Sequence, residues 1–181
     1  MKTIVSVLKD GSVGIIPTDT LYGVVGQALS KKAVERIYEA KGRDHSKPLI
    51  ILISKIADLE HFAVPKSIIK KHTTFLSGVW PGPVSVILPC KIKKLEYLHR
   101  GTKSLAFRMP NDKYLLALLA KTGPLVAPSA NPQGMPPAET IAEAKKYFKN
   151  TVDFYVPGGR KKGKPSTIIS LVTESPVVLR K

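Results

Sequence analysis

Short apolar runs bounded by glycine, proline or polar residues recur along the chain and predict strands of a buried sheet. Val84–Leu88 is typical, because Pro83 precedes it and Pro89 follows it. The other runs of this kind are Val13–Ile16, Leu49–Ile53, Leu105–Phe107, Leu125–Ala127, Phe154–Val156 and Thr167–Leu171. We expect each run to form a strand.

Apolar residues at helical spacing separate several of these strands. In Lys31–Lys41, Val34, Ile37 and Tyr38 share one face. Tyr114–Ala120 and Thr140–Phe148 are the other helical segments. Alternating strands and helices predict an α/β protein with a central twisted mixed sheet and flanking helices. At 181 residues, positions 1–181 are expected to form a single domain.

Proline and glycine are concentrated at the ends of the predicted strands. The chain has 15 prolines and 13 glycines, with clusters at Trp80–Pro83 and Pro157–Gly159. These segments cannot be long helices or central strands, so they predict shaped loops. Loops at strand ends are where functional sites are commonly built.

Composition narrows the class of protein and the kind of partner. The chain is 43% hydrophobic and 23% charged, which is typical of globular proteins. Its formal net charge of +16 favours contact with polyanions such as nucleotides or RNA. A solvated basic surface without any partner explains the charge equally well, because net charge alone identifies no ligand.

The single cysteine and the first residues indicate a reducing, cytoplasmic location. Cys90 has no partner for an intramolecular disulfide, and its position after a strand favours a packed thiol over a nucleophile. The apolar run near the N-terminus is broken by Lys9 and Asp10, so it is too short for a signal sequence or a membrane span.

Three polar turns follow predicted strands. The first, Pro17–Gly23, contains Thr18, Asp19, Thr20 and Tyr22. These groups can face a small ligand, and Gly23 lets the backbone approach closely. Alternatively, the hydroxyls and the carboxylate simply cap the turn, and without other evidence this is the more common situation.

The second turn is Lys41-Gly42-Arg43, which continues through Asp44 and His45 to Lys47. Its three cations suit a polyphosphate, which arginine can bind through two hydrogen bonds. Cations at a helix C-terminus that offset the helix dipole are the alternative. We expect His45 to be an exposed loop residue rather than a base.

The third turn, Ala127–Pro132, brings Ser129 and Asn131 close together, where they can orient phosphate or ribose oxygens or form a local Ser or Asx turn. The chain has no Walker A sequence, no dinucleotide glycine fingerprint and no metal-spaced Cys/His cluster. Any ATP site here must therefore use a different set of loops.

Taken together, six motifs resemble the YrdC family of threonylcarbamoyl-AMP synthases in order and spacing. They are Pro17–Gly23, Lys41-Gly42-Arg43, Lys47-Pro48-Leu49, Trp80–Pro83, Arg108-Met109-Pro110 and Ala127–Asn131. The resemblance covers nearly the whole chain, and its length is similar to the short bacterial TsaC form. It implies a YrdC-like fold with a basic concave surface.

The resemblance also implies a reaction in which L-threonine, bicarbonate and ATP give threonylcarbamoyl-AMP and pyrophosphate, for t6A modification of tRNA by downstream transfer enzymes. ATP is then a substrate, with Mg²⁺ carried by its phosphates. The implied catalytic residues are Lys41, Arg43, Ser129 and Asn131. The implied ATP-binding residues are Arg43, Lys47, Ser104, Ser129, Asn131 and Arg180. The implied threonine-binding residues are Thr20, Tyr22, Arg108, Ala127 and Ser166.

The implied chemistry brings a threonine carbamate and a triphosphate together, and a cluster of Lys41, Arg43 and Arg108 is expected to offset their repulsion. This sequence departs from many relatives at Asp44, Lys47, Leu52 and Pro137, which affects the expected ligand contacts more than the reaction. Two alternatives stay open: a carbamoyl-adenylate-forming module on the same scaffold, and an RNA-binding or ribosome-maturation protein. No membrane partner is expected.

Overall fold

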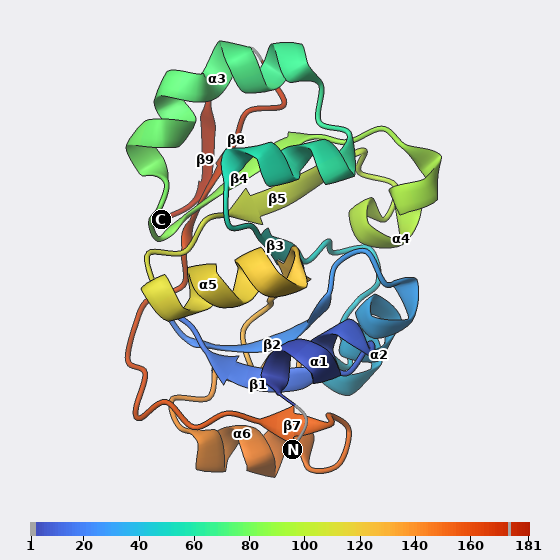
Figure 1. Ribbon diagram of the computed structural model, residues 1–181, viewed down its shortest axis with the longest axis vertical. Coiled ribbons are helices and arrows are strands. Elements are labelled where there is room, and N and C mark those ends of the chain that lie inside the picture. Colours follow the sequence, from blue (N-terminus) through green and yellow to red (C-terminus); the bar gives the residue numbers. More distant parts are fainter. Residues whose placement is uncertain (1–2, 174) are drawn as a thin grey trace.

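The computed structural model describes residues 3–173 and 175–181, and its centre is a mixed β-sheet (Figure 1). In the described residues the strand order is β7-β1-β2-β6-β3-β5-β4-β8-β9. The strands are β1 (Gly14–Pro17), β2 (Tyr22–Gln27), β3 (Ile50–Leu52), β4 (Val84–Pro89), β5 (Ser104–Arg108), β6 (Leu125–Val126), β7 (Phe154–Tyr155), β8 (Thr167–Ser170) and β9 (Val177–Arg180).

Helices flank this sheet (Figure 1). They are α1 (Ile4–Lys9), α2 (Lys31–Lys41), α3 (Lys66–Val79), α4 (Glu96–His99), α5 (Lys113–Thr122) and α6 (Ile141–Phe148), with 3₁₀ helices at Ile56–Phe62 and Lys93–Leu95. Neighbouring strands pair in both directions: β3 and β5 are parallel, whereas β4 and β5 are antiparallel. The predicted α/β class with a twisted mixed sheet is therefore confirmed.

Helix α2 shows how sequence signals fix an element and its packing. The Ser30 hydroxyl accepts the N–H of Ala33 at the start, and Gly42 ends the helix in the left-handed conformation that favours glycine. The helix packs on β2 at Gly26, where a Cβ atom would lie only 3.2 Å from Ile37 Cδ1. The apolar face of α2 is buried as predicted, and Lys41 is buried with it.

Two strands and one long helix were missing from the sequence prediction. Strand β2 begins inside the polar turn motif and contains two glycines, which weaken a strand pattern. Strand β9 is exposed along its whole length, so it lacks a buried face. Helix α3 was overlooked although it has apolar residues at helical spacing, and several of them pack against the core.

The core confirms the prediction for the single cysteine. Cys90 is fully buried, and its Sγ donates to the carbonyl oxygen of Phe62 at 3.2 Å. Burial raises the pKa of this thiol, which disfavours the reactive thiolate. In the described part of the chain, no helix combines the length and the hydrophobicity that a membrane span requires.

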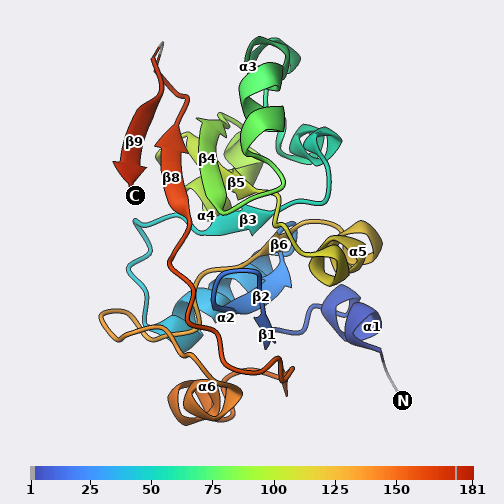
Figure 2. The same cartoon turned by 90° about the vertical axis from the view of Figure 1, so that its left-hand side faces the viewer.

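An irregular segment, residues 157–166, links the β7 side of the sheet to β8 and is called the strap below. In Figure 2 it runs past the β1–β2 region on its way to β8. A Cβ atom on Gly163 would lie 2.1 Å from the carbonyl oxygen of Thr20, so only glycine allows this close approach. The strap therefore lies directly against the first polar turn.

Candidate active site

A cavity of about 340 Å³ lies where the polar turns, the strap and the middle strands meet. Most of the predicted site residues line it. They are Thr20, Tyr22, Arg43, Ser104, Arg108, Ala127, Ser129, Ser166 and Arg180. Lys41, Lys47 and Asn131 do not line the cavity. Among the described residues that line the cavity none is acidic, so its polar wall consists of hydroxyls, backbone groups and guanidinium groups.

Thr18 and Thr20 divide the two roles that the sequence left open for the first turn. The Thr18 hydroxyl accepts the N–H groups of Thr20 and Leu21, both at 3.2 Å, and donates to the Leu21 carbonyl at 2.6 Å. Thr18 is therefore the residue that caps the turn. The Thr20 hydroxyl shares a 3.1 Å hydrogen bond with that of Thr18 and also accepts from Arg108 Nη1 at 3.0 Å, which connects it to the cavity wall.

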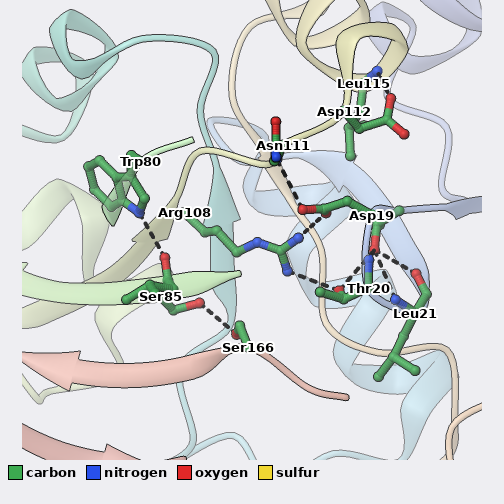
Figure 3. A network of polar contacts seen from close by, with 12 residues as sticks. Asp19, Thr20, Leu21, Trp80, Ser85, Arg108, Asn111, Asp112, Leu115 and Ser166 are labelled. Atoms are coloured by element: carbon green, nitrogen blue, oxygen red, sulfur yellow. Dashed lines mark hydrogen bonds and ion pairs between the residues drawn. The ribbon is translucent and has the colours of Figure 1, made fainter. Parts of the chain in front are cut away.

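Arg108 is the centre of a group that we call the Arg108 cluster, formed by Asp19, Thr20, Arg108 and Asn111 (Figure 3). Arg108 Nη2 pairs with the carboxylate of Asp19, and the other oxygen of that carboxylate accepts the N–H of Asn111 at 3.0 Å. Sequence analysis placed Asp19 in the turn motif but gave it no role in the site. The carboxylate connects the β1–β2 turn to the segment that follows β5.

One donor of this cluster has no partner. Arg108 is only 5% exposed, and its Nε makes no hydrogen bond within the described structure. Burial lowers the pKa of Arg108, and the Asp19 carboxylate opposes that effect. A buried unpaired donor is costly, so an oxygen acceptor in the cavity would be bound favourably here.

Tyr22 has a different use from the predicted threonine contact. Its hydroxyl accepts the N–H of Gly158 at 2.9 Å and donates to the carbonyl of Gly159 at 2.8 Å. Both hydrogen bonds hold the strap, so the phenol fixes the strap while its ring lines the cavity. Tyr22 thus lines the cavity, but its hydroxyl is engaged by the protein.

At the far end of the strap, Ser166 joins three elements. Its hydroxyl shares a 2.9 Å hydrogen bond with the hydroxyl of Ser85, which is fully buried on β4 (Figure 3). Its carbonyl accepts from Arg180 Nε at 3.0 Å and from Arg180 Nη2 at 2.7 Å. Arg180 of β9, predicted on the nucleotide side, thus borders the cavity beside a residue predicted on the threonine side.

Lys41 corrects the expected cluster of three cations facing the substrates. Its side chain is buried, and Nζ donates to the carbonyl oxygens of Ser129 and Asn131, each at 2.5 Å. Burial and the nearby Arg43 lower the pKa of Lys41 to about 7. The ammonium group therefore fastens the third polar turn to the end of α2 and does not face the cavity.

Asn131 and Ser129 complete this group, the Lys41 cluster, defined as Lys41, Arg43, Ser129 and Asn131. The Ser129 hydroxyl donates to Asn131 Oδ1 at 2.6 Å, and Asn131 Nδ2 donates to the carbonyl of Met135 at 2.7 Å. Asn131 is therefore used within its own loop, as the local-turn alternative predicted. Ser129 lines the cavity.

Arg43 lines the cavity and bonds only to backbone oxygens of its own loop. Its Nε donates to the Lys47 carbonyl at 3.1 Å, and Nη2 donates to the Pro48 carbonyl at 3.3 Å. The ammonium of Lys47 is 3.7 Å from Asp44 and its side chain is 58% exposed. His45 is an exposed loop residue, as predicted, and stacks on Tyr38.

The apolar part of the wall was missed by sequence reasoning. Ser104, Ala106 and Arg108 alternate along β5 and all line the cavity, and Ile50 and Leu52 do the same on β3. This period of two was available as a signal, because one predicted polar residue on β5 places its alternate neighbours on the same face. Ile87 and Ile168 extend the surface to β4 and β8.

Comparison with known proteins places this geometry in a family. The family model described as telomere recombination, which covers Sua5, YciO and YrdC proteins, matches residues 6–181. Threonylcarbamoyl-AMP synthase of Bacillus subtilis is 36% identical over 178 residues, covering 97% of this chain and 51% of that protein. The Nitrosococcus oceani threonylcarbamoyl-AMP synthase is 31% identical over 165 residues, covering 90% of this chain and 88% of that protein.

The solved structures agree. P. abyssi Sua5 complexed with L-threonine superposes with a TM-score of 0.88 at 34% identity, covering 97% of this chain and 52% of that chain. E. coli YciO gives a TM-score of 0.83 at 25% identity, covering 98% and 86%. The chain spans about half the length of the curated relatives from B. subtilis and P. abyssi. On the family match and these identities, the chain belongs to the Sua5/YciO/YrdC family.

Proposed function

We propose that this chain forms threonylcarbamoyl-AMP and pyrophosphate from L-threonine, bicarbonate and ATP, the product serving t6A modification of tRNA. The observation that carries the proposal is the shared cavity. One fold, matching Sua5 in complex with L-threonine, brings Thr20, Arg108 and Ser166 together with Arg43, Ser129 and Arg180. These are the residues that the family resemblance assigns to the amino acid and to the nucleotide.

The reaction joins two anions, so electrostatics and positioning are its main requirements. The neutral threonine amine attacks the carbon of bicarbonate with loss of water, or that of carbon dioxide with loss of a proton, and a carbamate forms through the new N–C bond. A carbamate oxygen then attacks the α-phosphorus, forming a new P–O bond as the bond from that phosphorus to the departing pyrophosphate oxygen breaks. No protein nucleophile takes part.

The cavity offers suitable groups for each part of this step. Guanidinium groups of Arg43 and Arg180 line the wall and can bind phosphate oxygens, and the apolar surface over β3 and β5 suits a flat base. The unpaired Nε of Arg108 suits an oxygen of the amino acid. Mg²⁺ would arrive on the phosphates, because hydroxyl and carbonyl oxygens in this wall cannot replace a carboxylate cage.

The test is pyrophosphate release by the purified protein. We expect release from ATP only when L-threonine and bicarbonate are both present. Omission of each component in turn is the control. Turnover that requires carbamoyl phosphate instead of threonine would assign the carbamoyl-adenylate chemistry. RNA binding without any threonine-dependent turnover would assign the non-catalytic alternative.

A further inference from the structure

Asp19 is the one acidic side chain in the Arg108 cluster, and neither the family motifs nor the proposed chemistry gives it a task. Its side chain is 11% exposed, and it is not part of the cavity wall. Its carboxylate contacts the guanidinium of Arg108 (Figure 3), and Arg108 does line the wall. Any influence of Asp19 on a ligand therefore acts through Arg108.

The hydrogen bonds of Arg108 show which of its donors is left for a ligand. Nη1 donates to the Thr20 hydroxyl at 3.0 Å and Nη2 pairs with Asp19. Among the described residues, Nε is the one guanidinium nitrogen of Arg108 without a hydrogen-bond partner, although Arg108 is only 5% exposed. Asp19 and Thr20 thus fix the guanidinium while its buried Nε–H stays available to a ligand oxygen.

The pairing also changes the charge that a ligand meets. A lone buried guanidinium attracts any anion, and a phosphate dianion more strongly than a carboxylate. A guanidinium paired with a carboxylate has a net charge near zero. Such a pair still donates a hydrogen bond, but it offers little long-range attraction to a dianion and no net repulsion to an ammonium group.

We propose that Asp19 is a specificity-determining residue that makes the Arg108 part of the cavity selective for a zwitterionic amino acid over free phosphate and other anions. An amino acid carries an ammonium beside its carboxylate, so its net charge matches that of the pair. This inference rests on the proposed function for the identity of the amino acid, L-threonine. The charge argument itself rests only on the Arg108 cluster.

Isothermal titration calorimetry tests the proposal with two ligands, L-threonine and inorganic phosphate, each titrated into wild type, Asp19→Asn and Asp19→Glu. Asparagine keeps an oxygen to accept the N–H of Asn111 but removes the charge. We expect Asp19→Asn to shift the affinity ratio toward phosphate by about tenfold or more. Asp19→Glu restores the charge and should return the ratio most of the way to the wild-type value.

Arg43 and Arg180 also line the cavity and are present in all three proteins, so their attraction for phosphate cancels in the comparison. An equal loss of affinity for both ligands in Asp19→Asn would show a merely structural role and overturn the proposal. An unchanged ratio would overturn it as well. Thermal melting of each variant shows whether it is folded.

A wild-type measurement tests the same idea if the Asp19→Asn protein does not fold. The probe is 2,3-dihydroxybutyrate, in which a hydroxyl replaces the ammonium of threonine, so the ligand is a plain anion. We expect it to bind about tenfold or more weakly than L-threonine. Equal or tighter binding would overturn the proposal.

Failure of the proposed function has a separate signature. If wild type neither binds L-threonine nor releases pyrophosphate with it, the function is wrong. The phosphate titrations still test the charge argument in that case, because they do not involve threonine. A gain in phosphate affinity in Asp19→Asn is then expected, and its absence counts against Asp19 alone.

Discussion

The Arg108 cluster and the Lys41 cluster both lie at one cavity and contain cations, but the groups that bond to those cations differ. Arg108 is paired with the carboxylate of Asp19, so the net charge of that cluster is close to zero. Lys41 and Arg43 bond to backbone carbonyl oxygens, which stabilise a cation without cancelling its charge. The Arg108 cluster therefore provides a surface suited to a zwitterion, and the Lys41 cluster one suited to a polyanion.

The two clusters also differ in which of their polar groups can contact a substrate. Arg108 has an unpaired donor, whereas the Lys41 ammonium is turned away from the cavity toward the third polar turn. Within the Lys41 cluster, only Arg43 and Ser129 line the wall. We therefore expect Arg43 to act on the substrate, and Lys41 to act through the backbone that it holds.

The largest expected effect is that of Arg43→Ala. Loss of one preorganised charge contact with the phosphates should lower kcat/KM for ATP by about 10²-fold or more. The measurement is pyrophosphate release at varied ATP. Arg36→Ala on the preceding helix α2 is the control, because Arg36 pairs with Asp153 outside the cavity. Wild-type turnover in Arg43→Ala would remove the phosphate contact from the proposed mechanism.

Lys41→Met tests whether the buried ammonium is a structural tie. The substitution takes the ammonium donor from two part-buried carbonyl oxygens; that of Ser129 keeps the N–H of Asn131 at 3.0 Å, whereas that of Asn131 loses its donor. An unsatisfied buried polar group costs about 1–3 kcal/mol, and relief of a buried charge offsets part of that. We expect unfolding to become easier by about 2 kcal/mol, or roughly 4–8 °C in Tm.

The control for this substitution is Lys32→Met, an exposed lysine on the same helix. It should leave Tm nearly unchanged, because exposed charges contribute little to stability. If Lys41→Met melted like wild type but lost ATP turnover, the ammonium would be acting on the substrate and the assignment from the structure would be wrong.

Thr20→Val tests the Arg108 cluster, and its expected effect is smaller than those of Arg43→Ala and Lys41→Met. Valine keeps the shape but removes the acceptor for Arg108 Nη1, so Arg108 should bind the amino acid less well. We expect the KM for L-threonine to rise about tenfold and Tm to fall by a few degrees, because Arg108 Nη1 and the Thr18 hydroxyl each lose a partner. Thr18→Val is the contrasting variant: its hydroxyl caps the turn, so its main effect should be a lower Tm. A Thr20→Val protein with lowered Tm and unchanged KM would contradict the division of roles.

The sequence predicted helices and strands well where a pattern of residues has one main structural meaning. The bounds of α2 were predicted as observed from the helical spacing of Val34, Ile37 and Tyr38, and the structure adds the caps that fix its ends. The strand segments of β3, β4 and β5 were found because buried strands are apolar runs between turn residues.

Most of the predicted site positions line one cavity, but the contacts of several side chains differ from those expected. Lys41, Tyr22 and Asn131 lie in the turns that the motifs indicated, yet their polar groups bond to the protein backbone. A side chain's partner depends on which loops the fold brings together, and no local pattern encodes that. Asp19 was passed over for the same reason, since its partner Arg108 is distant in sequence. The basic concave surface and the single-domain organisation stay predictions.

The smallest expected effect is the dependence of stability on pH. It distinguishes the two clusters because a lysine, unlike an arginine, loses its proton within the pH range in which unfolding can be measured. Burial and Arg43 lower the pKa of Lys41 from 10.5 to about 7 in the folded protein. Between these values the unfolded chain holds the proton more tightly than the native state does. The free energy of unfolding should therefore rise with pH across this window, and below about pH 7 the full cost of burying the charge is present.

The slope contributed by one group is at most about 1.4 kcal/mol per pH unit, and the two carbonyl acceptors reduce it because they favour the charged ammonium. Urea unfolding of wild type and Lys41→Met at several pH values between about 6 and 10 isolates this contribution as the difference between the two curves. Wild type should gain stability relative to Lys41→Met as pH rises. The guanidinium of Arg108 stays charged throughout, so Thr20→Val should show no such trend against wild type. The difference in stability between wild type and Lys41→Met could instead be independent of pH. The two carbonyl oxygens would then hold the Lys41 proton over the whole range. In that case the two clusters would differ in net charge but not in their response to pH.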